Sequence, residues 1–309
     1  FEIASLFFEY GEHEYVVKFT DLIKKDSSYL YRDSVILKTK SLSRLSEEKK
    51  AIDSLNDLAE EFTDNSSLAL INIRLASIFE NLQDYGKASD AYFNIIKTRT
   101  DKWQDNIAAR RLFVLFENKS ITIKNKEKII LLADALHEAG ENDKSLKIIS
   151  LISREDQDKE SDITAVKILT ASGRNEVYPV LNNKKNTPYY DNLILEHSNT
   201  LWDKGAGHEA VRRYREITDS ADDEIARRVL VRLIFFYEER NKNEAIRYMD
   251  QFCKRFPEDE LTGRLKWMTG RHYLKESRYA EAAKYFKESI KLFPYGEYSA
   301  NCRYWLYLI

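Results

Sequence analysis

A small residue followed four positions later by a large apolar one recurs along this chain. In the stretch YAEAAKYFKESIKLFP, residues 279–294, Ala282 is followed by Phe286. One repeat earlier, Ala245 is followed by Met249. Four positions are about one helical turn, so the two members of each pair lie on the same face of a helix. The pattern therefore predicts amphipathic helices that each bury one stripe of side chains.

The spacing of these pairs predicts a repeated structural unit. The small residue recurs at Ala51, Ala88, Ala210, Ala245 and Ala282. The last two copies are each followed twelve positions later by a proline, Pro257 or Pro294. Proline has no backbone N–H to donate, so it is expected to end the second helix of each copy. A helix–turn–helix unit with a period near 34 residues is typical of the tetratricopeptide repeat (TPR).

Two copies resemble the TPR signature closely. In residues 263–294 the matching positions are Gly270, Tyr273, Tyr279, Ala282, Phe286 and Pro294. In residues 69–100 they are Leu75, Ala76, Phe79, Tyr85, Ala88 and Tyr92. The resemblance implies an all-α fold, a TPR-like right-handed superhelical solenoid of antiparallel helix pairs. We expect the small side chain of Ala282 to let the second helix approach the first closely, with Gly270 as its match.

The repeat is uneven, and this unevenness predicts three segments. Residues 1–154 hold N-terminal TPR-like repeats with an extra helix pair within 103–140. Residues 155–190 form an irregular connector of short helices, with prolines and polar stretches such as NNKKNTP. Residues 191–309 hold the regular C-terminal TPR repeats.

Composition favours a helical protein that binds neither nucleic acid nor membrane. Only 9 glycines and 4 prolines occur among 309 residues, which is few for a protein rich in turns. The net charge is −2, so the chain as a whole has no electrostatic attraction for nucleic acid. No apolar run reaches the roughly 20 residues of a transmembrane helix, so no membrane span is predicted. Since Phe1 opens the chain in the middle of a helical pattern, we expect a fragment of a longer precursor.

The sequence contains no recognisable motif for catalysis, for a cofactor or for a metal. Its five histidines include no pair four residues apart, the spacing of many helical zinc sites. A phosphate-binding loop, a dinucleotide fingerprint and a nucleophile elbow are also absent. Cys253 and Cys302 are expected to be buried small apolar side chains, with a disulfide as the alternative. The sequence thus predicts a chain that is not an enzyme, with no catalytic residue, cofactor or metal ligand.

The first helix of each TPR unit lines the concave face of the solenoid, which is the face that usually binds. The resemblance places the partner-binding groove of the C-terminal repeats at Asn199, Trp202, Arg227, Tyr237, Arg264, Trp267 and Arg271. The same positions of the unit also fall on apolar residues, among them Leu230 and Ile234.

Two interpretations of this groove stay open. Arginine and aromatic residues are enriched at interface hot spots, and the guanidinium fork matches a carboxylate. The groove would then bind an acidic or extended peptide. Alternatively, the arginines pair with neighbouring glutamates along exposed helices and the rings serve only packing.

Two C-terminal stretches suggest a cellular setting. KRFPEDELTGRLKW and KLFPYGEYSANCRYWLYLI are similar to bacterial cell-envelope TPR modules. These are the scaffold of soluble lytic transglycosylases and the repeat modules of division and outer-membrane-assembly lipoproteins. The resemblance implies a non-catalytic scaffold or adaptor that binds a protein or peptide partner in the bacterial periplasm or cell envelope.

An alternative is the superhelical domain of a peptidoglycan lytic transglycosylase, whose catalytic domain would lie beyond Ile309 and would contact peptidoglycan. A cytoplasmic regulator or chaperone adaptor is a third possibility.

Overall fold

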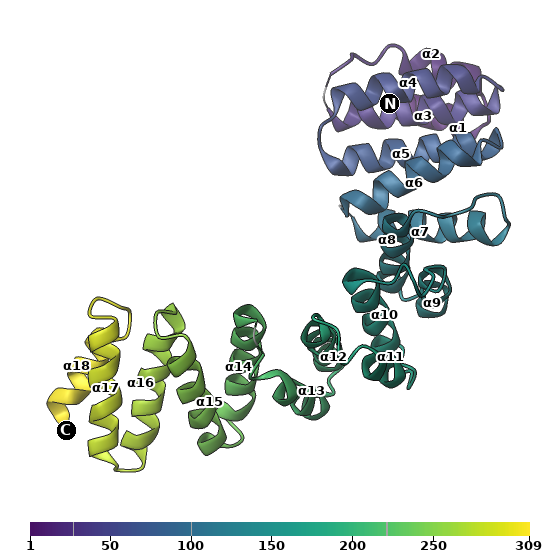
Figure 1. The fold of residues 1–309 in the computed structure, drawn as a ribbon. Coiled ribbons are helices and arrows are strands. Elements are labelled where there is room, and N and C mark those ends of the chain that lie inside the picture. The colour runs from purple at the N-terminus through teal and green to yellow at the C-terminus, as the bar shows by residue number, and fades with distance from the viewer. Residues whose placement is uncertain (27, 100, 221) are drawn as a thin grey trace. The chain divides into compact units, whose positions relative to one another are not determined.

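A computed structural model of the chain describes residues 1–26, 28–99, 101–220 and 222–309 (Figure 1). Within these ranges all regular structure is helical, with 18 α-helices, one short 3₁₀ helix and no strand. Consecutive helices form antiparallel pairs that stack along the chain. The predicted all-α, TPR-like solenoid is therefore confirmed. No helix in the described part of the chain is long and apolar enough to cross a membrane.

Packing divides the chain into two compact units, Phe1–Ile168 and Leu169–Ile309, here called unit 1 and unit 2. Unit 1 contains α1 (Glu2–Glu9), α2 (His13–Thr20), α3 (Tyr29–Arg44), α4 (Glu48–Glu61), α5 (Asn65–Asn81), α6 (Tyr85–Thr98), α7 (Lys102–Glu117), α8 (Lys126–Glu138), α9 (Asn142–Ile149) and most of α10 (Lys159–Ala171). Unit 2 continues with α11 (Val177–Asn183), α12 (Tyr190–Asp203), α13 (Gly207–Tyr214), the 3₁₀ helix η1 (Arg215–Ile217), α14 (Asp223–Glu238), α15 (Lys242–Arg255), α16 (Glu260–Lys275), α17 (Tyr279–Leu292) and α18 (Ser299–Leu308). The division between the units falls inside α10.

Unit 1 departs from regular pairing in its middle. Helices form over most of 103–140, as α7 and α8, and a long loop joins them. That loop places Ile121 and Ile123 against the hydrophobic core. Helix α8 then continues through a short turn into α9. The connection between α7 and α8 is therefore a loop fixed to the core by two isoleucines, and α8 forms its short-turn pair with α9.

Most of the short turns between paired helices share one backbone motif, although the α14–α15 turn closes instead with a bond from Asn241 N–H to the Tyr237 carbonyl. A residue in the left-handed conformation follows the first helix, for example Gln83 with φ of 60° and Gly140 with φ of 79°. The next N–H then bonds to a carbonyl five residues back, as from Glu141 to Leu136 at 2.8 Å. This arrangement satisfies carbonyls at the helix end and reverses the chain within a few residues. This turn recurs along the solenoid, and each copy makes the two helices that it joins antiparallel.

The small residues of the repeat lie at the centre of the packing. All five predicted positions are fully buried, with relative exposures of 0%: Ala51, Ala88, Ala210, Ala245 and Ala282. Each lies on the second helix of a pair. On α17 the large partner, Phe286, is also at 0%. Its ring lies against Gly270, where a Cβ atom would be only 2.7 Å from the ring atom Cδ1. The glycine thus makes room for the ring of Phe286.

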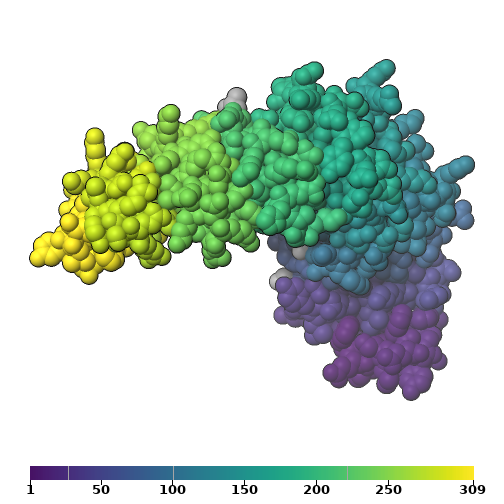
Figure 2. Space-filling model, turned by 90° about the horizontal axis from the view of Figure 1, so that it is seen from below, coloured from purple at the N-terminus to yellow at the C-terminus, as the bar shows by residue number. Residues whose placement is uncertain are grey.

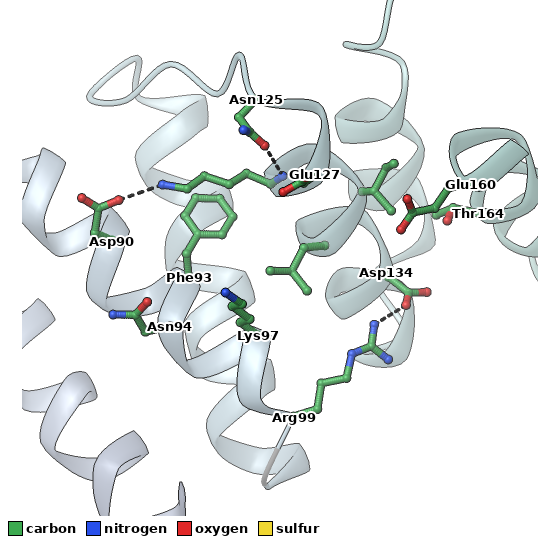
Figure 3. A pocket seen from close by; sticks show the side chains of 13 residues that line it. Asp90, Phe93, Asn94, Lys97, Arg99, Asn125, Glu127, Asp134, Glu160 and Thr164 are labelled. Atoms are coloured by element: carbon green, nitrogen blue, oxygen red, sulfur yellow. Dashed lines mark hydrogen bonds and ion pairs between the residues drawn. The ribbon is translucent and has the colours of Figure 1, made fainter. Parts of the chain in front are cut away.

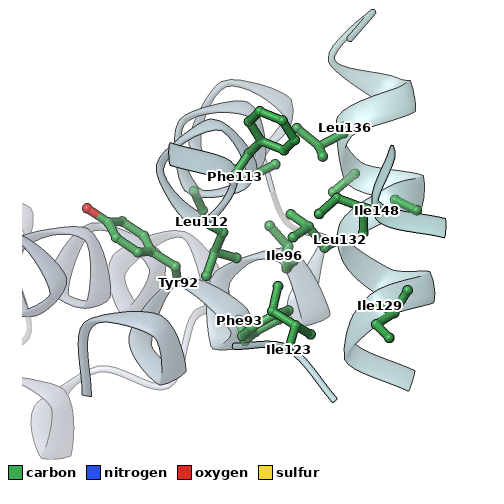
Figure 4. Close-up of a cluster of buried hydrophobic side chains, with 14 of the residues drawn as sticks. Tyr92, Phe93, Ile96, Leu112, Phe113, Ile123, Ile129, Leu132, Leu136 and Ile148 are labelled. Atoms are coloured by element: carbon green, nitrogen blue, oxygen red, sulfur yellow. The ribbon is translucent and has the colours of Figure 1, made fainter. Parts of the chain in front are cut away.

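Unit 1 contains an apolar cluster that extends from α5 to α10 (Figure 4), and a second cluster on α3, α4 and α5. Figure 4 shows Leu112 and Phe113 of α7 meeting Leu132 and Leu136 of α8. Between them lies Ile96 from the end of α6. In unit 2, side chains close the spaces between the helix ribbons, as the green-to-yellow region of the space-filling view shows (Figure 2). Each helix therefore buries its apolar stripe against its neighbours, as expected for a solenoid.

A buried histidine makes unit 2 sensitive to acid. His197 is 1% exposed, and its Nδ1 lies 2.7 Å from the Thr170 hydroxyl. Its Nε2 is buried and has no hydrogen-bond partner among the described residues. Burial, assisted by the charge of Arg213, lowers the pKa of His197 to about 4. The unfolded chain keeps a histidine pKa near 6.5, so it binds a proton that the folded chain rejects between these values. Stability therefore falls as pH drops through this window.

We expect the free energy of unfolding to decrease by about 2 kcal/mol between about pH 7 and pH 4.5 through this group. Urea denaturation of wild type and His197→Gln across this range measures the effect. The variant should lose less stability on acidification than wild type. Parallel pH profiles for the two proteins would show that His197 does not contribute.

Candidate functional site

The seven residues predicted to line a groove all lie on first helices of successive pairs in unit 2. Asn199 and Trp202 are on α12, Arg227 and Tyr237 on α14, and Arg264, Trp267 and Arg271 on α16. Helices α12, α14 and α16 are consecutive first helices of the stack, so these positions belong to neighbouring repeats. Their individual contacts separate them into two groups.

Three of the seven are engaged within the fold. Arg227 Nε lies 2.5 Å from Asp259 Oδ2, and this contact lowers the pKa of the Asp259 carboxyl. The Asn199 amide oxygen accepts a hydrogen bond from the Tyr214 hydroxyl at 2.7 Å. The Tyr237 hydroxyl accepts one from Arg215 at 2.7 Å. The Arg227 and Tyr237 contacts join neighbouring repeats, whereas the Asn199 contact lies within the α12–α13 pair.

The other four belong to a series of arginines stacked on aromatic rings. The guanidinium carbon of Arg271 lies 4.9 Å from the Trp267 ring centre, and that of Arg264 lies 5.9 Å from the Phe235 ring centre. Arg232 completes the series, 5.5 Å from the Trp202 ring centre. We call these six residues the arginine–aromatic face: Trp202, Arg232, Phe235, Arg264, Trp267 and Arg271.

The three stacked arginines lack an anionic partner. All three are exposed, and among the described residues no carboxylate lies within ion-pair distance of Arg232, Arg264 or Arg271. By contrast, the neighbouring Arg228 lies 4.0 Å from Glu224. A guanidinium stacked on a ring keeps its N–H donors in the ring-parallel plane, where they can bind a carboxylate edge-on.

The aromatic rings of this face are held by the fold behind it. Trp267 packs against Tyr298 with ring centres 4.9 Å apart. Trp202 packs against Phe236 at 5.9 Å. Phe235 differs from these rings because it is 46% exposed. The rings therefore fix where the arginines sit, and Phe235 offers apolar surface to a ligand.

Two shallow hollows border the face. One, of about 480 Å³, lies between α12 and α14 and includes Arg232. The other, of about 280 Å³, includes Arg264 and Tyr298. Carboxylates also line both hollows, Asp203 in the first and Glu297 in the second. The residues around the face carry charges of both signs, so the overall potential does not select an acidic ligand. Selective binding therefore depends on direct hydrogen bonds from the arginine guanidinium groups to the ligand carboxylates.

Sequence reasoning missed Arg232 and Phe235. The groove positions taken from the family fall instead on Leu230 and Ile234, which are fully buried on α14. The sequence does contain one indication of this pair: Arg232 and Phe235 are three residues apart and so lie on one face of a helix. Which face of α14 points outward depends on its packing against α12 and α16.

The described residues show no arrangement for metal chemistry. They contain no group of three or more His, Cys, Asp or Glu side chains placed to hold a metal ion. Cys253 and Cys302 are both buried free thiols, as expected, so the alternative of a disulfide does not apply. Burial raises the pKa of the Cys253 thiol to about 11, so this thiol is a poor nucleophile at neutral pH.

Comparison with known proteins supports the repeat at the level of fold. A family model described as tetratricopeptide repeat matches residues 228–259, which cover most of α14 and all of α15. This match includes Arg232 and Phe235 of the arginine–aromatic face. A search of curated proteins finds no match.

Two solved structures are similar to the chain over nearly its whole length. One is a monomeric mutant of IFIT1 with Gppp-AAAA, at 11% identity and a TM-score of 0.30, covering 96% of this chain and 68% of that one. The other is a human IFIT1 dimer with m7Gppp-AAAA, at 13% identity and a TM-score of 0.29, covering 92% and 66%. The chain thus spans about two thirds of each neighbour. TM-scores near 0.3 indicate only weak overall similarity, and they do not indicate a shared ligand.

Proposed function

We propose that this chain is a non-catalytic scaffold or adaptor whose arginine–aromatic face binds an acidic peptide segment of a protein partner. One observation supports the proposal: Arg232, Arg264 and Arg271 are stacked on rings, are exposed, and have no carboxylate partner in the part of the chain that the structure describes. Several other exposed arginines of unit 2, such as Arg227, are paired with carboxylates, whereas Arg240 and Arg303 bond only to backbone carbonyls or a serine among the described residues. What distinguishes the series is that its three arginines lie on two neighbouring first helices, α14 and α16.

The chemistry of the face suits an extended ligand with spaced carboxylates. Stacking restricts each guanidinium before the ligand arrives, so less side-chain entropy is lost on binding. A charge-assisted hydrogen bond from a fork to a carboxylate contributes about 1.5–3 kcal/mol. The exposed ring of Phe235, between the arginines of α14 and α16, gives an apolar contact beside them.

A bacterial envelope setting is the finer part of this proposal, and it rests on the sequence alone. Its support is the resemblance of two C-terminal stretches, 254–267 and 291–309, to periplasmic repeat modules. The alternative from the same resemblance is the scaffold domain of a lytic transglycosylase. An export signal and a downstream glycan-cleaving domain in the full-length gene favour the transglycosylase. An export signal without such a domain favours an envelope adaptor.

The proposed function is tested by titrating the protein into labelled peptides and following fluorescence anisotropy. The probes are an extended peptide of alternating glutamate and leucine and its lysine counterpart. We expect binding of the acidic probe only, and a marked weakening as NaCl rises from about 50 mM to about 500 mM, because exposed charges are screened. Equal binding of both probes, or binding insensitive to salt, would overturn the charge-based account.

A further inference from the structure

A further hollow lies within unit 1, whereas the arginine–aromatic face belongs to unit 2. It has a volume of about 660 Å³ and is bounded by α6, α8 and α10 (Figure 3). This volume lies within the range of about 300–1,000 Å³ that is typical of ligand sites. Its apolar part is formed by Phe93, Ile130 and Leu131.

Most cations around the hollow are already neutralised. Lys128 lies over the Phe93 ring at 4.8 Å and its Nζ is 2.8 Å from Asp90. Arg99 is paired with Asp134 and with Glu138. Figure 3 shows these pairs at opposite edges of the hollow. Their charges are therefore largely unavailable to a ligand.

Two carboxylates at the hollow lack such a partner. Glu127, at the start of α8, and Glu160, at the start of α10, both line it, and neither has a cation within ion-pair distance among the described residues. The nearby Lys126 is bonded to Asp158 at 2.5 Å, although it also interacts with Glu160 over a longer distance. The remaining unpaired cation of the hollow is Lys97.

A mostly buried threonine provides a further polar group at the hollow. Thr164 lines the hollow beside Glu160 and is only 7% exposed. Its hydroxyl has no hydrogen-bond partner among the described residues, although helical threonines commonly bond a carbonyl one turn back. Because the residue lines the hollow, its hydroxyl is available to hydrogen-bond a bound polar group.

We propose that this hollow is a second binding site, which accepts a basic side chain of an extended peptide. The aliphatic stem of a lysine or arginine would lie on Phe93, Ile130 and Leu131, as long basic side chains do on apolar surfaces. Its charged head would reach Glu127 and Glu160, with Thr164 accepting a further hydrogen bond. Lys97 opposes this ligand through like charge.

The test is a titration of a labelled, acetylated and amidated Gly-Leu-Arg-Leu-Gly peptide into the full chain. In Glu127→Gln/Glu160→Gln, we expect the affinity for this peptide to fall about tenfold or more. Thr164→Val should weaken binding about fivefold and Thr164→Ser should preserve it. Lys97→Gln should strengthen binding, because it removes the opposing charge.

The matched control is Glu12→Gln/Glu60→Gln, which removes the same charge from two exposed positions of unit 1. It should bind like wild type. Equal losses in the two glutamine variants, or weaker binding by Lys97→Gln, would overturn the proposal. So would an absence of binding by wild type at millimolar peptide. The substitutions Arg264→Glu/Arg271→Glu change only unit 2. If the arginine–aromatic face fails to bind the acidic peptide, the test of the hollow with the basic peptide still stands.

Discussion

Replacing Phe286 by alanine is expected to destabilise the last repeat of unit 2 by about 3–5 kcal/mol. Phe286 is fully buried and packs with Ala282 and Cys302, and its ring fills the space that Gly270 leaves open. Its loss removes apolar burial and leaves a cavity. Urea denaturation followed by circular dichroism measures the change. Tyr295→Ala is the control, since Tyr295 is 99% exposed, and its stability should change little.

A second substitution tests the contact itself. An alanine Cβ at position 270 would meet the Phe286 ring, so Gly270→Ala should destabilise wild type. In the Phe286→Ala background the space is free, and Gly270→Ala should stabilise by about 1 kcal/mol, as glycine to alanine does within a helix. The two changes should therefore be coupled. Additive effects of the two substitutions would show that this contact does not hold the helices in register.

The helical repeat could be predicted because its determinants are local. A small residue and a large one four positions later identify a helix face without knowledge of the neighbours. Ala245 and Ala282 are fully buried for this reason. The prolines act locally too, and α15 and α17 end two residues before Pro257 and Pro294.

The full set of residues in the arginine–aromatic face could not be predicted from the sequence, because contacts between repeats decide which side chains belong to it. Arg227 pairs with Asp259, one repeat away, whereas Arg264 stacks on Phe235 of the preceding first helix. Sequence spacing gives both arginines the same place in their units. Only the rotation of each helix about its axis, which packing sets, decides which arginine meets a carboxylate. Arg232 was missed for the same reason.

Reversing the charge of two arginines is expected to abolish binding of an acidic peptide. Arg264→Glu/Arg271→Glu removes two forks and places like charge beside the ligand. The loss should exceed about 3 kcal/mol, or more than about a hundredfold in affinity. Neither arginine forms an ion pair with any residue that the structure describes, so the circular-dichroism spectrum and thermal midpoint should stay close to those of wild type. Anisotropy titration measures the affinity.

A matched control exists on the second helix of the same repeat. Lys287 and Lys291 of α17 are exposed, and the structure gives neither a carboxylate within ion-pair distance among the described residues. Lys287→Glu/Lys291→Glu changes the net charge by the same amount on another helix. This control distinguishes weaker binding caused by loss of the two face arginines from weaker binding caused by the more negative net charge.

The most direct test of the binding face is one titration of the labelled glutamate–leucine peptide into wild type, Arg264→Glu/Arg271→Glu and Lys287→Glu/Lys291→Glu, at the same low salt concentration. The proposed face predicts that wild type and the lysine variant bind with affinities within about threefold of each other, since distant exposed charges act weakly. It predicts no detectable binding by the folded arginine variant. Binding of the arginine variant at the wild-type level, or an equal loss in both variants, would contradict the claim that this face holds the partner.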